Sequence, residues 1–278
     1  AYSGFIPNSD FMPIRRHYKD SVLVEAWEKL VQSTAKAGDK YHLTPAARFD
    51  LADVTRQVLS DLYARLFVRL MGFVHRHIPY HRQGYNVPGG HVTSVKEAEA
   101  MMQKLEDLIR QVDELVGTQP HMLLGKWIDD ARSWGQDEQE ADHLEFNARN
   151  VITLWGPRGE IADYASKQWS GLLSEYYLPR WSLFFQFLRA ALQSQSEFDQ
   201  PAFQQALLAF EQEWGLRTTP KLPAKPHGDV VSLVKRIDKE WGPLVRETMH
   251  EDVYDVPLPP LVRAPGADVL AEQLEGRT

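Results

Sequence analysis

The 278-residue sequence predicts an all-α protein, a single helical domain of about eight or nine helices. Apolar residues recur at spacings of three and four along most of the chain, the pattern of a helix with one buried face. Residues that favour helix ends stand before and after these periodic segments. Alternation of apolar and polar residues, which is typical of strands, is scarce. These three observations agree on an all-helical architecture.

The first two helices have clear start signals. One is predicted over residues 21–36, with Asp20 as its cap. The next opens at Thr44 and Pro45, because a threonine can cap a helix and proline fits its first turn. An apolar stripe over residues 51–73 then predicts a long helix with one buried face.

Capping and periodicity predict the remaining helices. Ser94 and Glu97 form a capping-box pattern, and the helix that they open is expected to end before Gly117 and to lie antiparallel to a neighbour. Further helices are predicted over residues 122–134, 137–154, 161–177, 179–193, 201–214 and 229–249.

The helical domain is predicted to span residues 21–250. After it the periodicity fails and residues 256–265 contain four prolines, so we expect residues 251–278 to form an extended tail. The sequence starts Ala-Tyr-Ser, with neither a Met nor a signal-like apolar stretch. We therefore expect this start to be processed, trimmed or cut from a longer protein.

Composition excludes several functions. The formal net charge is −7, which argues against a nucleic-acid partner because phosphate binding requires a basic surface. The most apolar segment, residues 181–192, is interrupted by Gln186 and Arg189, so we expect no membrane span. Without cysteine the chain has no disulfide, thiolate metal site or cysteine nucleophile. Neither a Gly-rich phosphate loop nor a Gly-x-Ser-x-Gly elbow occurs.

Two kinds of metal site can be considered. Glu140 with His143 and Glu247 with His250 have the Glu-x-x-His spacing of di-metal carboxylate proteins. We expect both to be solvated surface pairs, since the first lies in an acid-rich helix start. Four further histidines surround a Gly/Pro-rich loop, but without a diagnostic zinc spacing. We therefore expect no metal and no other cofactor; these histidines are His75, His77, His81 and His91.

One stretch, from Asn147 to Trp181, concentrates aromatic, amide and charged side chains. Gly156 and Pro157 interrupt the helical pattern there, so we expect Trp155 on a turn between two helices. Aromatic rings can cover the apolar face of a sugar while Arg, Asn and Asp bind its hydroxyls. The alternative is that these aromatic side chains form helix core, and it is the favoured interpretation for Trp181.

The same stretch resembles the C-terminal helical domain of glycoside hydrolase family 89, the α-N-acetylglucosaminidases. The similar strings are Asn147 to Pro157, Asp163-Tyr164-Ala165, Lys167-Gln168, Tyr176-Tyr177 and Pro179-Arg180-Trp181. Weaker likeness extends over residues 20–249. The chain departs from the family at Val151, where a polar residue is usual, in the loop over residues 75–90, and after Met249.

The resemblance implies an exo-acting retaining hydrolase that removes terminal α-linked N-acetylglucosamine from glycans. In that family two catalytic glutamates lie upstream in a (β/α)₈ barrel, and the helical domain closes one wall of the sugar pocket. Residues 1–20 would then continue from the upstream catalytic domain, and the partners would be that barrel and the glycan. Relatives act outside the cytosol or in lysosomes, although no Asn-x-Ser/Thr sequon occurs here.

On this resemblance we expect no catalytic residue in the chain itself. Trp155 would contact the sugar, and Arg149 and Arg180 would hold the turn through bonds to carboxylates such as Asp163. The expected pocket-wall residues are Trp155, Tyr164, Arg149 and Arg180, supported by Asn147, Asp163, Tyr176, Tyr177 and Trp181.

A second hypothesis is a non-catalytic binding or scaffolding module whose exposed aromatic surface docks a protein partner. Both hypotheses predict an exposed apolar patch. Only the glycosidase hypothesis predicts that Trp155 lies in an accessible concavity.

Overall fold

The computed structural model describes residues 18–37, 43–78, 92–156, 163, 165–218 and 222–249. Within these ranges the chain is helical, and its only strand-like pairing is an isolated bridge between Leu123 and Ser170. The prediction of an all-α protein is therefore confirmed. The helices are α1 (Asp20–Ala37), α2 (Pro45–His77), α3 (Val95–Val116), α4 (Leu124–Arg132), α5 (Glu138–Ile152), the π-helix η2 (Leu173–Tyr177), α6 (Leu178–Ser194), α7 (Gln200–Leu216) and α8 (Val230–Thr248).

Side-chain caps fix the helix starts that the sequence predicts. The Thr44 hydroxyl accepts the Ala47 N–H at 3.2 Å, and Pro45 occupies the first position of α2. The Ser94 hydroxyl accepts the Glu97 N–H at 3.2 Å at the start of α3. These bonds satisfy N–H groups that have no partner within the helix. Aspartates cap three further helices in the same way; they are Asp137, Asp199 and Asp229.

The prediction that Asp20 caps the first helix is wrong. Asp20 is the first residue of α1 and is buried, and its carboxylate accepts the Arg65 Nε–H at 2.6 Å. The same guanidinium donates to the Thr248 carbonyl at 3.0 Å, at the end of α8. A buried carboxylate requires such a partner, so Asp20 links α1 to α2 and α8 instead of capping a helix.

The predicted helix over residues 161–177 is also wrong. Residues 166–169 are not helical, and the Asp113 carboxylate of α3 accepts the Gly171 and Ser174 N–H groups at 2.8 and 3.1 Å. The helix therefore begins beyond Gly171, passes through η2, and continues into α6 without a break. At that junction the Leu178 N–H bonds to the Leu173 carbonyl, five residues back, which is the π-helical pattern.

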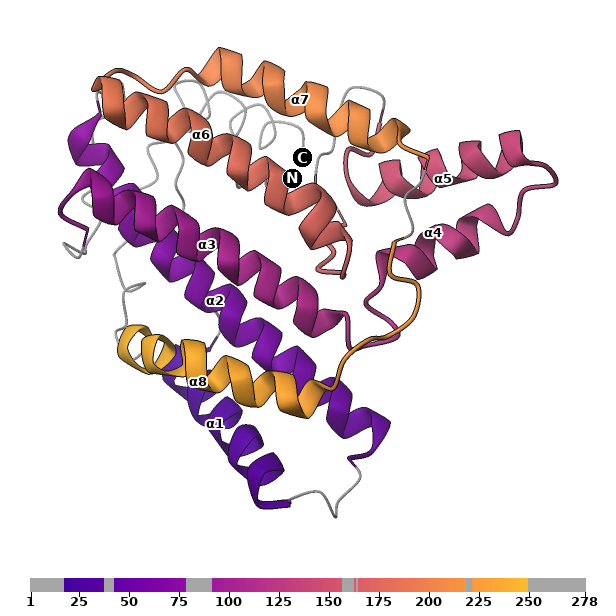
Figure 1. Ribbon diagram of the computed structural model, residues 1–278, viewed down its shortest axis with the longest axis horizontal. Coiled ribbons are helices and arrows are strands. Elements are labelled where there is room, and N and C mark those ends of the chain that lie inside the picture. Colours follow the sequence, from indigo (N-terminus) through magenta and orange to yellow (C-terminus); the bar gives the residue numbers. More distant parts are fainter. Residues whose placement is uncertain are drawn as a thin grey trace, which may run out of the picture.

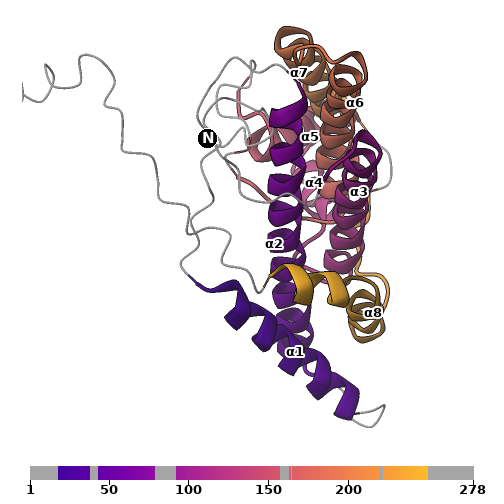
Figure 2. The ribbon, with the colours of Figure 1, turned by 90° about the vertical axis from the view of Figure 1, so that its left-hand side faces the viewer.

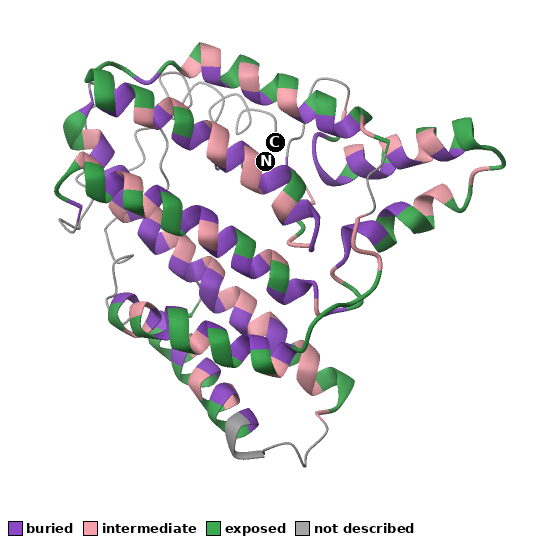
Figure 3. Ribbon diagram, viewed as in Figure 1, coloured by how far each residue is buried: buried purple, intermediate pink, exposed green. Residues whose placement is uncertain are grey.

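Helices α1, α3 and α8 pack against α2, the longest of the helices. Its antiparallel neighbour α3 contacts α6 and α8 as well, and α1 packs against α2 and α8 (Figure 1). The second view shows a flat arrangement of these helices with α1 diverging at one end (Figure 2). Buried residues line the facing sides of α2, α3 and α6 (Figure 3). No helix in the described ranges has the length and apolar character that a membrane span requires.

Two helices, α4 and α5, form a hairpin that projects from this body (Figure 1). The Trp127 Nε1–H of α4 donates to the Ala148 carbonyl of α5 at 2.9 Å. The C-terminal part of α7 packs against α5. The hairpin thus places the end of α5, where the stretch resembling family 89 begins, beside α7. The predicted tail, residues 251–278, and most of the lead-in segment lie outside the described residues.

Candidate functional site

A turn at the end of α5 presents Trp155. The indole side chain is 40% exposed, and the backbone has a φ of 37° at Trp155 and 123° at Gly156. The Trp155 N–H donates to the Asn150 carbonyl at 2.7 Å. The Asn150 side chain accepts the Gly156 N–H at 2.8 Å through Oδ1 and donates to the Gly156 carbonyl at 3.3 Å through Nδ2. A left-handed conformation is costly for tryptophan, so it persists only where surrounding bonds impose it.

Asp163 fixes the chain where it returns from this turn. Its φ is 59°, and its N–H donates to the Thr153 carbonyl at 2.7 Å. Its carboxylate accepts two bonds from one terminal nitrogen of Arg180, at 2.8 and 2.9 Å. Both side chains are buried. Of the two arginines expected to bond carboxylates such as Asp163, Arg180 does so, and this pair ties Asp163 to α6.

Arg180 serves a second carboxylate. Its Nε lies 2.7 Å from Oε1 of Glu211 on α7, and the Tyr176 hydroxyl donates to the same oxygen at 3.3 Å. The guanidinium also lies over the Tyr176 ring, 4.9 Å from its centroid. Burial raises the pKa of Glu211 although the charge of Arg180 opposes the shift, and burial raises the pKa of both Tyr176 and Tyr177.

Arg149 forms a second buried ion pair beside the first. Its Nε and one terminal nitrogen donate to Glu145 at 2.8 and 2.6 Å, and its guanidinium lies 4.7 Å from the centroid of the Trp214 ring. Glu145 also accepts from Arg132 of α4 at 2.8 Å. Trp214 in turn packs against Tyr176, with centroids 4.8 Å apart. The two ion pairs therefore meet through Trp214 and join α4, α5, α6 and α7.

The expected site residues thus differ in how deeply they are buried. Trp155 is exposed on the turn, and Asn147 is exposed on α5. The arginines and Asp163 are buried beneath the turn. Trp181 lies in the core, with its ring centroid 5.0 Å from Tyr63, as the core interpretation expected. Tyr164 lies outside the described residues.

Sequence reasoning assigned no role to three residues that hold this region. Asn150 lies inside the quoted string, and Glu145 stands four residues before Arg149, a spacing that favours an ion pair on a helix. Glu211 is distant in sequence, and no local pattern connects it to Arg180.

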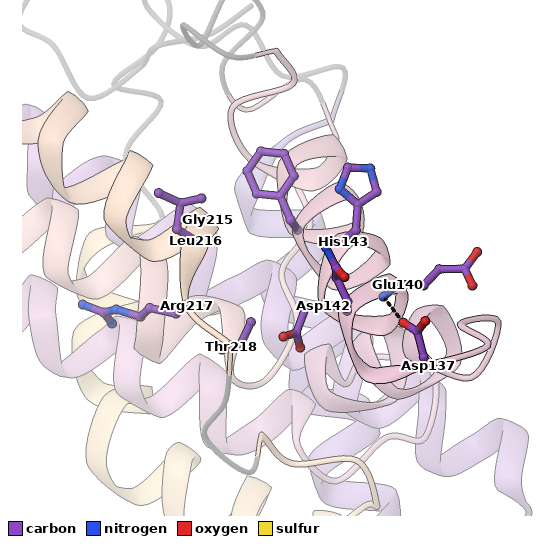
Figure 4. Close-up of a pocket in the computed structure, with 10 residues that line it drawn as sticks. Asp137, Glu140, Asp142, His143, Gly215, Leu216, Arg217 and Thr218 are labelled. Carbon is purple, nitrogen blue, oxygen red and sulfur yellow. Dashed lines mark hydrogen bonds between the residues drawn. The ribbon is translucent and has the colours of Figure 1, made fainter.

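The structure also forms a groove between α5 and α7, with a volume of about 770 Å³. Trp155 is not among its lining residues, so the expected concavity around the indole is not this groove. Glu140 and His143 line it but point in different directions (Figure 4). The full lining comprises Asp137, Gln139, Glu140, Asp142, His143, Phe146, Gly215, Leu216, Arg217 and Thr218.

No group of three or more His, Asp or Glu side chains converges on a metal position anywhere in the described ranges. His75 is partly buried, which lowers its pKa, and His77 stacks on Phe73 with centroids 3.8 Å apart. The other histidines of the sequence-level metal hypotheses, His81, His91 and His250, lie outside the described residues.

Comparison with known proteins identifies the family. The sequence model of the Alpha-N-acetylglucosaminidase (NAGLU) C-terminal domain matches residues 5–240. Human alpha-N-acetylglucosaminidase is 33% identical over 226 residues, which cover 81% of this chain and 28% of the human protein.

Solved structures agree. A family 89 glycoside hydrolase from Clostridium perfringens, in complex with 2-acetamido-1,2-dideoxynojirmycin, superposes with a TM-score of 0.65 and 25% identity. A further structure from that organism, in complex with its substrate GlcNAc-alpha-1,4-galactose, gives the same TM-score and identity. In both cases the match covers 81% of this chain and 24% of the other. The chain thus spans about a quarter of the length of these relatives. It belongs to the family of alpha-N-acetylglucosaminidase C-terminal domains.

Proposed function

We propose that this chain is the helical C-terminal part of an exo-acting retaining glycoside hydrolase that removes terminal α-linked N-acetylglucosamine from glycans. It packs on an upstream (β/α)₈ barrel and closes one wall of the sugar pocket. The observation that carries this proposal is the presentation of Trp155, a partly exposed indole on a turn whose backbone is fixed from both sides. The proposed working compartment is extracellular or lysosome-like, as for the family.

The proposed division of labour follows from the chemistry. Retaining hydrolysis requires a carboxylic acid to protonate the leaving oxygen and a carboxylate nucleophile about 5–5.5 Å away. We assign both to the upstream barrel. The indole of Trp155 supplies an apolar face for the sugar ring and keeps water from that side. Arg149 and Arg180 do not contact the sugar; their buried ion pairs support the turn.

The first test measures fluorophore release from an aryl α-N-acetylglucosaminide. The chain is assayed alone and again after addition of the separately expressed barrel. No activity alone and activity on mixing would support the proposal. Activity of the chain alone would place the catalytic carboxylates within these residues and overturn the division of labour. Binding to the barrel with no gain in activity would favour the docking-module hypothesis.

The second test is Trp155→Ala in the full-length enzyme. Loss of a buried indole contact of about 2 kcal/mol predicts a decrease in kcat/KM of about 30-fold. The melting temperature should change little because the side chain is partly exposed. Trp134→Ala is the matched control, since that indole is 81% exposed between α4 and α5. An unchanged kcat/KM in Trp155→Ala would remove Trp155 from the pocket wall.

A further inference from the structure

We infer that Asn150 is the positioning residue for Trp155: its side-chain amide holds the turn that presents the indole. This inference rests on the proposed place of Trp155 in the sugar pocket. It assigns Asn150 no contact with the sugar itself.

The argument begins with the backbone of the turn. Trp155 and Gly156 both have positive φ, and at Trp155 a side chain opposes that conformation. Asn150 makes three of the bonds that hold these two residues. Its carbonyl accepts the Trp155 N–H at 2.7 Å, while its side chain bonds to both the N–H and the carbonyl of Gly156. The Asn150 amide thus forms two hydrogen bonds with the main chain of Gly156, the residue after Trp155.

The Asn150 amide makes both of the Gly156 bonds because it carries a separate acceptor and donor. Oδ1 accepts from the N–H at 2.8 Å, and Nδ2 donates to the carbonyl at 3.3 Å. A residue at this position that offers neither group leaves the Gly156 N–H and carbonyl to water. The Asn150 carbonyl would then still accept the N–H groups of Thr153 and Trp155, but the Asn150 side chain would no longer hold Gly156.

The other side of the turn is fixed independently. Asp163 bonds to the Thr153 carbonyl and is held by Arg180, so the chain before and after the turn stays in place without the Asn150 side chain. Substitution of Asn150 is therefore expected to loosen the orientation of Trp155 without unfolding the domain. Displacement of a positioning group by about 1 Å can cost up to about 100-fold in rate.

The test is a double-mutant cycle in the full-length enzyme. Asn150→Ala should lower kcat/KM by about 10-fold. In the Trp155→Ala background it should change kcat/KM by less than about 2-fold, because the indole that it orients is already gone. The same 10-fold loss in both backgrounds would overturn the inference. Val151→Ala, an exposed substitution in the same turn of α5, is the control and should leave kcat/KM unchanged.

A second readout does not depend on activity. The enzyme is labelled with 5-fluorotryptophan, and the signal of Trp155 is identified by its loss in Trp155→Phe. Asn150→Ala should shift or broaden that fluorine signal while Val151→Ala leaves it in place. An unmoved signal overturns the inference. A moved signal with no effect of Trp155→Ala on activity would keep the positioning role and reject the proposed function of Trp155.

If Asn150→Ala does not fold, Asn150→Asp takes its place in the cycle. It removes the Nδ2 donor and retains an acceptor for the Gly156 N–H. The same dependence on Trp155 is expected. Independence from Trp155 would overturn the inference in this variant too.

Discussion

The two ends of α5 carry similar side chains in opposite surroundings. At the C-terminal end Arg149 is 2% exposed. It forms an ion pair with Glu145, and its guanidinium lies over the Trp214 ring. At the N-terminal end Glu140 and His143 are exposed along the α5–α7 groove. The sequence suggested a functional role at each end, a metal site at Glu140 and His143 and a pocket wall at Arg149. The difference teaches that burial, not residue type, determines which charged groups of this helix are bound into the structure.

The largest expected effect on stability comes from breaking the buried ion pair at the C-terminal end of α5. Arg149→Ala removes one partner of a buried ion pair, which typically costs about 3–5 kcal/mol. The full-length protein should unfold at a clearly lower urea concentration. Lys126→Ala is the control, because its pair with Asp130 is exposed and such pairs contribute about 1 kcal/mol or less. Equal shifts for the two variants would contradict the contrast between buried and exposed charges.

A smaller effect is expected in the pH dependence of stability, through Glu211. Burial raises its pKa in the folded state above the ordinary value of 4.5, so the folded protein binds the proton more tightly than the unfolded chain. Its contribution to stability is therefore most favourable below the unfolded pKa and is lost as the pH rises through the folded pKa.

Glu211→Gln checks this sign, since it removes the titration but retains an acceptor for Tyr176. The melting temperature of the unmodified protein, relative to this variant, should increase as the pH is lowered from neutral toward 4.5. A difference that stays constant or decreases on acidification would show that the Glu211 pKa is not raised.

The smallest effect belongs to the exposed end. His143→Ala should change the free energy of unfolding by no more than about 0.5 kcal/mol, as for most surface substitutions. Activity on the aryl substrate should remain unchanged, because the groove does not include Trp155. Urea unfolding and kcat/KM measurements check both statements. A large loss of activity would place the groove in the functional site.

The sequence predicted what local chemistry controls. Thr44 and Ser94 mark helix starts because a cap and its recipient N–H lie three residues apart. The core position of Trp181 was the favoured interpretation because its neighbours recur at helical spacing. Bonds from Arg149 and Arg180 to carboxylates such as Asp163 were expected from complementary charge; Arg180 bonds to Asp163, whereas Arg149 bonds to Glu145.

Contacts between distant segments could not be predicted in this way. The predicted helix over residues 161–177 is wrong because Asp113, on α3, binds the N–H groups where the helix actually starts. The approach of Trp214 to Arg149 and of Glu211 to Arg180 depends on α7, which follows much later in the chain. The spacing of apolar residues along the chain predicts neither of these contacts.

The π-helical junction has a consequence for how this domain tolerates insertions and deletions. In η2 a bond spans five residues where an α-helix spans four, so one residue is added without a break in the helix. Deleting one residue there would let the wide turn close to an α-helical turn, so the helix would stay continuous and the residues after it would keep their faces. Arg180 would then remain on the side of α6 that faces Asp163 and Glu211. This turn can therefore absorb the loss of one residue, whereas the same loss within a regular turn of α6 would rotate the residues after it by about 100°.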